Sequence, residues 1–189
     1  MINRKLFRVI TMETQSKITI ENVVASSIIS HYLDLGKIQG LLSETEYDPD
    51  KFPALIYQKK YPRFMILLFN NGKMICTGLN GVKMTKDAII EFIDKLRDCS
   101  AFIMDNIKIE IQSIIASAEL DKKVSVREIY NNRSLRNAEL ATDGLEALIY
   151  RPPMEGITCL IFPSGKIAFS GSRDIQQVEK LYLDIKEKL

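Results

Sequence analysis

The chain repeats itself at a spacing of about ninety residues, and this duplication restricts its fold more than any other feature. Residues 66–78 read ILLFNNGKMICTG and residues 159–171 read CLIFPSGKIAFSG, an offset of 93. ALIY at 54–57 returns at 147–150 with the same offset, and KITIENVVAS at 17–26 returns as KIEIQSIIAS at 108–117, offset by 91. Three blocks in one order indicate a duplicated structural unit. We therefore expect two similar halves related by an approximate two-fold axis.

The composition is that of an ordinary globular protein, with 46% apolar and 26% charged residues in a chain of 189. We divide it into a short basic lead-in at 1–16, a first repeat at 17–98 and a second repeat at 107–189. The net charge is only +2, and neither repeat is strongly basic. An anionic partner would therefore meet a local basic patch rather than a strong overall field.

Several kinds of site have little support in the sequence. The three cysteines lack metal-ligand spacing, and Cys76 and Cys159 lie in apolar runs that favour buried, reduced thiols. The single histidine, His31, and scattered carboxylates offer no catalytic constellation, so we expect no enzyme, metal or cofactor. No apolar run approaches the length of a membrane span, and the N-terminus does not resemble a signal peptide.

Each repeat predicts the element order strand, helix, four strands, helix. In the first repeat we expect strands at 17–27, 46–47, 54–59, 64–69 and 73–79, with helices at 34–43 and from a cap at Thr85 to about 97. Asn71-Gly72 predicts a tight hairpin. In the second repeat we expect strands at 108–118, 138–142, 146–151, 157–162 and 166–171, with helices at 125–136 and 174–188. This order predicts an α+β fold, an antiparallel sheet with helices on one face.

Several predicted strands are apolar at every position, which such a sheet does not require. FMILLF at 64–69 and CLIF at 159–162 lack the alternation expected when one face packs on helices and the other meets water. The second face would then expose an apolar patch of the kind that marks a partner site. A sheet covered on both faces, or a homodimer, would also account for the pattern.

Three segments resemble the TATA-binding protein family: NVVA at 22–25, YDPDKFPALIY at 47–57 and LFNNGKMICTG at 68–78. The family patterns read roughly YxPExFPGLxYR and LIFxSGKxVxTG, and the likeness covers both repeats. It implies a saddle-shaped, ten-stranded curved antiparallel sheet with helices on the convex face and the minor groove of promoter DNA against the concave face. Apolar residues that fill this groove and wedge between base steps would explain the uncovered face, and flexible TA-rich steps would favour the kink.

The first repeat keeps the residues of the family at these positions. The resemblance implies wedging by two phenylalanines, base-edge contacts from an asparagine and a threonine, groove packing by aliphatic residues, and a phosphate contact from a lysine: Phe52 and Phe69; Asn22 and Thr77; Val24, Leu67 and Ile75; and Lys73. Gln58 stands where the family usually has arginine, which weakens one phosphate contact.

The second repeat departs further from the family pattern. The corresponding wedges are Phe162 and Leu145, the polar positions are Ser113 and Ser170, the apolar ones are Ile115, Leu160 and a small Ala168, and the basic ones are Arg151 and Lys166. The loop Leu140–Gly144 has lost the YxPE signature through which the family docks transcription factor B. We expect this half to hold bases less specifically.

The resemblance implies a general transcription initiation factor that binds and bends A/T-rich promoter DNA and recruits transcription factor B and RNA polymerase. The alternative is a divergent paralogue that serves as a protein-interaction module or as a competitor with weak DNA binding or weak factor B recruitment. A free chain could pair with a second copy through its concave face. The location would be the nucleus in a eukaryote, or the nucleoid within the cytoplasm in an archaeon.

Overall fold

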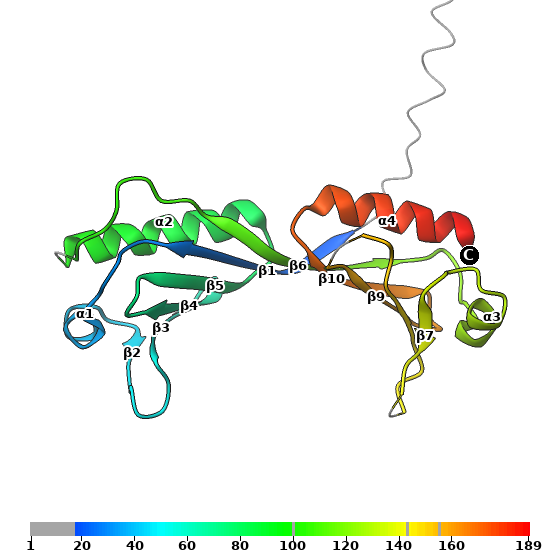
Figure 1. Cartoon of the computed structure of the whole chain (residues 1–189), viewed down its shortest axis with the longest axis horizontal. Helices are drawn as coiled ribbons and strands as arrows, with labels where there is room; N and C mark the ends of the chain where they lie inside the picture. Colours follow the sequence, from blue (N-terminus) through cyan, green and yellow to red (C-terminus); the bar gives the residue numbers. More distant parts are fainter. Residues whose placement is uncertain (1–17, 100, 143, 155) are drawn as a thin grey trace, which may run out of the picture.

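The computed structural model describes residues 18–99, 101–142, 144–154 and 156–189; the predicted lead-in at 1–16 lies outside them. Ten antiparallel strands form one sheet in the order β2-β3-β4-β5-β1-β6-β10-β9-β8-β7. The order is the same from either edge once five is added to each strand number, so the two repeats are related by a two-fold axis between β1 and β6. Figure 1 shows the sheet arched like a saddle, which confirms the predicted fold class.

Each repeat follows the predicted order of elements. The first repeat contains β1 (Thr19–Ile28), α1 (Leu35–Leu41), β2 (Thr45–Glu46), β3 (Ala54–Lys60), β4 (Arg63–Phe69), β5 (Lys73–Leu79) and α2 (Val82–Asp98). The second contains β6 (Glu110–Glu119), α3 (Val126–Asn131), β7 (Ala138–Leu140), β8 (Leu148–Tyr150), β9 (Thr158–Ile161), β10 (Lys166–Ser172) and α4 (Ile175–Lys188).

The helix ends correct two predictions from the sequence. Thr85 is not the cap of α2. It lies inside the helix, where its buried hydroxyl donates to the carbonyl of the N-cap Gly81 at 2.8 Å. Helix α3 ends at Asn131 rather than near 136, because Asn132 forms its C-cap and Arg133 turns the chain with a φ of 52°. By contrast, Asp174 caps α4 at the predicted start, accepting from the backbone N–H of Gln176 at 3.0 Å.

The hairpin turns before β5 and β10 require glycine for two reasons. Gly72 and Gly165 have φ values of 76° and 93°, a region that other residues rarely adopt. A Cβ on Gly72 would lie 2.0 Å from the carbonyl oxygen of Ser30, and one on Gly165 would lie 2.4 Å from that of Lys122. Each of the two turns therefore packs against the segment that follows the first strand of its own repeat. The antiparallel pairing of β4 with β5 confirms the predicted hairpin at Asn71-Gly72.

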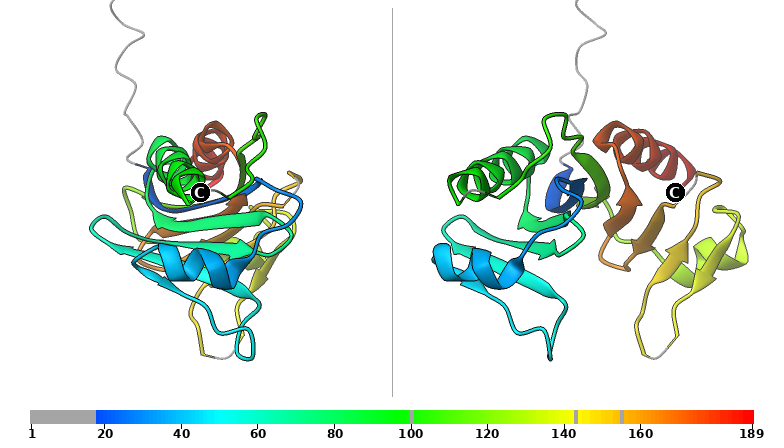
Figure 2. Two further views of the ribbon diagram at one scale, coloured as in Figure 1. Left: turned by 90° about the vertical axis from the view of Figure 1, so that its left-hand side faces the viewer. Right: turned by 60° about the vertical axis from the view of Figure 1, so that its left-hand side comes forward.

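The two faces of the sheet have different surroundings. Figures 1 and 2 show α2 and α4 along the convex face, with α1 and α3 at the outer ends of the arch. Along β4 the burial alternates strictly: Phe64, Ile66 and Leu68 are buried, while the residues between them are partly exposed. The apolar runs therefore alternate in environment even though they do not alternate in polarity, and none of the described residues covers the concave face.

The convex face holds one hydrophobic core in each half. Helix α2 contributes Phe92 to the core of the first half, where its ring lies 4.7 Å from that of Tyr57. Helix α4 contributes Tyr182 to the core of the second half, where its hydroxyl donates to the carbonyl of Glu119 at 2.8 Å. No helix in the described ranges is long and apolar enough to cross a membrane.

We expect the three thiols to differ sharply in reactivity. Burial raises the pKa of Cys76 and of Cys159 to about 12, which lowers their thiolate fraction about a thousand-fold from that of an ordinary cysteine. Cys99 is partly exposed at the end of α2. Titration with an aromatic disulfide at pH 8 should show one fast thiol in the native protein and three after denaturation. Fast reaction of two or more native thiols would contradict this packing.

Candidate nucleic-acid interface

Apolar side chains form matching rows across the concave face of the two halves. In the first half, strand register places Leu67 beside both Ile56 and Ile75. In the second, Leu160 lies beside Ile149 and Ala168. All six side chains are partly exposed and point away from the helices. The rows are related by the offset of 93, and only the replacement of Ile75 by Ala168 makes the second row smaller.

Strands β1 and β6 supply the centre of this face. Val24 pairs with Ser113, and Asn22 pairs with Ile115, so the four predicted central residues meet at the two-fold axis. Ile115 is 37% exposed, which is high for an isoleucine in the middle of a ten-stranded sheet. The centre is thus an open surface of mixed apolar and polar side chains.

The predicted wedge residues lie where the sheet meets its two hanging loops. Phe52 comes from the β2–β3 loop, is 38% exposed, and has its ring 6.4 Å from the ring of Phe69 at the end of β4. Leu145 comes from the β7–β8 loop and is 48% exposed, and Phe162, just after β9, is partly exposed. Figure 1 shows both loops projecting below the arch, one on each side of the concave face.

The polar residues predicted to meet base edges have protein partners in this structure. The side-chain oxygen of Asn22 accepts from the backbone N–H of Gly78 at 2.8 Å, and its nitrogen donates to the Thr77 hydroxyl at 3.1 Å. In the second half, the Ser113 hydroxyl accepts from the N–H of Gly171 at 3.3 Å. Serine therefore replaces asparagine as the partner of the glycine N–H. It has no side-chain amide with which to donate to a base.

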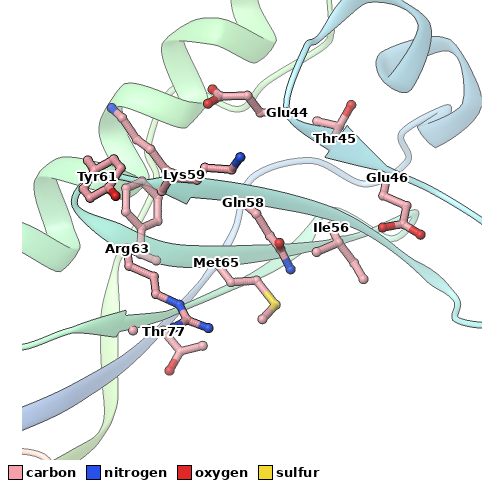
Figure 3. A pocket seen from close by; sticks show the side chains of 13 residues that line it. Glu44, Thr45, Glu46, Ile56, Gln58, Lys59, Tyr61, Arg63, Met65 and Thr77 are labelled. Carbon is pink, nitrogen blue, oxygen red and sulfur yellow. The ribbon is translucent and has the colours of Figure 1, made fainter.

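The basic residues are distributed unequally between the halves. Lys73 and Lys166 are both exposed at the start of the last strand of their repeat. Arg151 forms an ion pair with Glu139 at 3.0 Å, so the guanidinium predicted to contact phosphate is partly engaged. At the related place in the first half, Gln58 cannot form such a pair with Glu46. Figure 3 shows Gln58 on the same side of the strands as Ile56, with Glu46 near the edge.

Two residues of the concave face were absent from the sequence predictions. The register of β1 against β6 slips between Ile20 and Asn22 and again between Val24 and Ala25, which makes Glu21 and Gln112 bulge residues. Glu21 accepts from the Ser117 hydroxyl at 2.5 Å, and Gln112 donates to the Ser26 hydroxyl at 2.8 Å. The offset of 91 relates both pairs, and applying it to every polar residue in the central strands would have found them.

Comparison with known proteins agrees with this geometry. The family model described as "Transcription factor TFIID (or TATA-binding protein, TBP)" matches the chain twice, at residues 17–99 and 108–189. The chain belongs to the TATA-binding protein family. The sequence resemblance is thereby confirmed, and with it membership of a family of transcription factors rather than enzymes.

Archaeal members of the TATA-binding protein family are similar over nearly the whole chain. The TATA-box-binding protein of Picrophilus torridus is 34% identical over 178 residues, which cover 94% of this chain and 97% of the relative. That of Archaeoglobus fulgidus is 33% identical over 173 residues, 92% of this chain and 94% of the relative. The solved structure of Methanococcus jannaschii TBP superposes with a TM-score of 0.82 at 29% identity, covering 90% of this chain and 97% of that one.

Gln58 stands beside Glu46 where the second repeat has the Arg151–Glu139 ion pair, and this difference provides a specific prediction. We expect Gln58→Arg to strengthen duplex binding several-fold at low salt, because a guanidinium there would offset the carboxylate and reach a phosphate. One added phosphate contact steepens the dependence of log K on log salt by about 0.9. Fluorescence anisotropy across a potassium chloride series measures both quantities. Gln176→Arg, which adds the same charge on convex α4, is the control, and an equal gain from it would contradict a local effect.

Proposed function

We propose that this protein binds the minor groove of A/T-rich promoter DNA with its concave face and kinks the duplex. The observation that carries the proposal is the apolar concave face, which no described residue covers. Two loops that carry the exposed Phe52 and Leu145 flank it. A patch of this kind on a folded domain marks a partner site. The minor groove of DNA matches such a face. A·T pairs present few hydrogen-bonding groups there that distinguish one base pair from another, and apolar side chains can lie along the groove floor.

The proposed contacts divide by chemical role. Val24, Leu67, Ile75, Ile115 and Leu160 would follow the groove floor. The pair Phe52–Phe69 and the pair Leu145–Phe162 would wedge open one base step each, at opposite ends of the contact. Unstacking costs a few kcal/mol per step and is repaid by the surface that bent DNA brings into contact.

Polar and basic groups would then hold the bent duplex. Asn22 and Thr77 would give up their mutual hydrogen bond and donate to base-edge acceptors instead. Ser113 and Ser170, each with a single hydroxyl, would make fewer such hydrogen bonds. Lys73, Lys166 and Arg151 would contact phosphates, Arg151 after loosening its pair with Glu139. A kink of about 80° is the known value for the TATA-binding protein, and we expect a bend of that order here.

We further propose that the bound complex acts in transcription initiation, in the nucleoid of an archaeal cell, by recruiting a transcription factor B and RNA polymerase. The sequence similarity to archaeal TATA-box-binding proteins supports this setting. The sequence at Leu140–Gly144 lacks the family signature for docking transcription factor B. Weak docking of that factor would favour a second candidate function. In that candidate, the protein occupies DNA as a competitor that recruits factor B weakly.

Binding and bending of end-labelled duplexes test the proposal directly. The parent protein should shift a TA-rich duplex and bring its ends closer by fluorescence energy transfer, with much weaker binding to a G·C-rich duplex of equal length at the same low salt. Equal affinity for both duplexes, or no binding to either, would overturn it. Adding transcription factor B separates the candidates, since an initiation factor gives a larger complex and a competitor does not.

The same samples report on self-association. We propose that free protein can form a dimer through the concave face, because that face would otherwise hold ordered water against apolar side chains. Sedimentation velocity should then show a dimer that dissociates when the TA-rich duplex is added.

We likewise propose that the two repeats, 17–98 and 107–189, each contact one half of the DNA site.

A further inference from the structure

The two halves differ in charge at one place on the groove-facing surface. The bulge residue of β6 is a neutral amide, Gln112, and the bulge residue of β1 is a carboxylate, Glu21. Ser117, which donates to Glu21, lies between two buried alanines and so faces the concave side. Glu21 is therefore held on the concave face, on the side of the two-fold axis that belongs to the second repeat.

The Glu21 carboxylate has no cationic partner among the described residues. One of its oxygens accepts from Ser117, and the other accepts no hydrogen bond there. Glu110 is a useful contrast. Glu110 pairs in register with Ser26 of β1. The Lys108 ammonium lies 2.7 Å from its carboxylate and holds the pKa of that carboxyl below its usual range. Within the part of the chain that the structure describes, Glu21 thus presents an acceptor near the centre of this face that no cation compensates.

The sheet beside Glu21 is also shallower than its counterpart. Ser117 pairs in register with Ala168, whereas the equivalent Ser26 pairs with Ile75. Ala168 presents a single methyl group where Ile75 presents a branched butyl group. A chemical group that projects from the floor of the groove would therefore find room beside Glu21 and would meet Ile75 in the other half.

The minor groove offers one group that matches both features. A·T pairs present only acceptors there, which would face an unpaired carboxylate unfavourably, and a G·C pair adds the guanine N2 amino group, a projecting donor. Resting on the proposed groove binding, we propose that Glu21 is a base-reading residue that selects a G·C pair under the second repeat, with Ala168 providing the space. On the side of the first repeat, Gln112 of β6 and Ile75 hold the equivalent positions, and A·T pairs are selected there.

A single-substitution scan of the duplex tests this proposal. Each A·T pair of a TA-rich site is replaced in turn by G·C, in both orientations, and binding is measured by anisotropy. The parent protein should bind one such duplex about ten-fold more tightly than it binds the neighbouring substitutions. Replacing that guanine by inosine, which lacks the N2 amino group, should remove the preference. A flat scan, or a preference that survives inosine, would overturn the proposal.

Protein variants then assign the preference to residues. Glu21→Gln should abolish it and tighten binding to the all-A/T duplex, because an amide can donate to A·T acceptors. Glu110→Gln is the matched control and should leave the scan unchanged. Ala168→Ile should remove the preference, because the larger side chain fills the space that the guanine amino group requires. If no duplex binds at all, the proposed function fails. If A/T duplexes bind but Glu21→Gln changes nothing, only this inference fails.

Discussion

Phe69→Ala is expected to lower affinity for a TA-rich duplex by ten- to a hundred-fold and to reduce the bend, with little change in stability. The Phe69 ring is partly exposed on the concave face and lies outside both hydrophobic cores. The ring of Phe52 lies beside it at a centroid distance of 6.4 Å, so the two rings would act as one wedge. Without the ring, the base step stays stacked and the sheet loses contacts that only bent DNA provides, worth a few kcal/mol.

Anisotropy gives the affinity, fluorescence transfer between the duplex ends gives the bend, and urea denaturation gives the stability. Phe102→Ala is the matched control, because this phenylalanine is 75% exposed in the segment between α2 and β6 and belongs to neither wedge. It should bind and bend DNA as the parent does. Parental binding by Phe69→Ala would remove the wedge from the mechanism.

Aspartate at two neighbouring leucines is expected to have opposite consequences. Leu68 is fully buried under the helices, so an aspartate there would lose the packing of the leucine and bury a carboxyl group without a partner. The cost is several kcal/mol, a large part of the roughly 5–15 kcal/mol by which a domain of this kind is stable, so Leu68→Asp should be largely unfolded. Leu67 faces the concave side, and Leu67→Asp should fold with a stability within about 1 kcal/mol of the parent. It should nevertheless bind TA-rich DNA more than a hundred-fold more weakly, because the carboxylate would face groove acceptors and phosphates.

Circular dichroism and urea denaturation follow folding, and anisotropy follows binding. Leu67→Asn separates charge from lost packing, since it removes the aliphatic side chain without adding a charge, and it should weaken binding less than the aspartate does. If Leu67→Asp unfolds, or binds DNA normally, the concave face does not meet DNA in the proposed way.

The two halves of this saddle are chemically unequal in a consistent direction. The first repeat has two neighbouring phenylalanine rings at the proposed wedge positions and a hydrogen-bonded asparagine–threonine pair. The second has Leu145 at one of the proposed wedge positions, serines at the polar positions, and an arginine paired with Glu139. Such inequality would give the bound protein a preferred orientation on DNA, because each half fits a different half-site.

Much of the fold follows from the sequence because duplication and turn chemistry are local signals. The repeat offsets predict the symmetric strand order, Asn71-Gly72 predicts its hairpin, and the residue types give nearly every strand its place. The errors concern helix ends. Thr85 has the right residue type for a cap, but the backbone enters α2 one turn earlier, at Gly81. Helix α3 ends where Arg133 adopts a left-handed conformation that its residue type does not predict.

By itself, the sequence determined that the chain holds two equivalent units, and that the sheet has more apolar surface than one layer of helices can cover. That the two units pair through their first strands, β1 and β6, was decided by the tertiary structure. Only the tertiary structure decided which apolar residues lie under α2 and α4 and which remain open, since FMILLF has no polarity difference between its faces. The structure also decided, through the bulges in β1 and β6, that Glu21 and Gln112 turn toward the concave face. Register and ion pairs such as Arg151–Glu139 depend on long-range strand pairing, which local residue patterns do not encode.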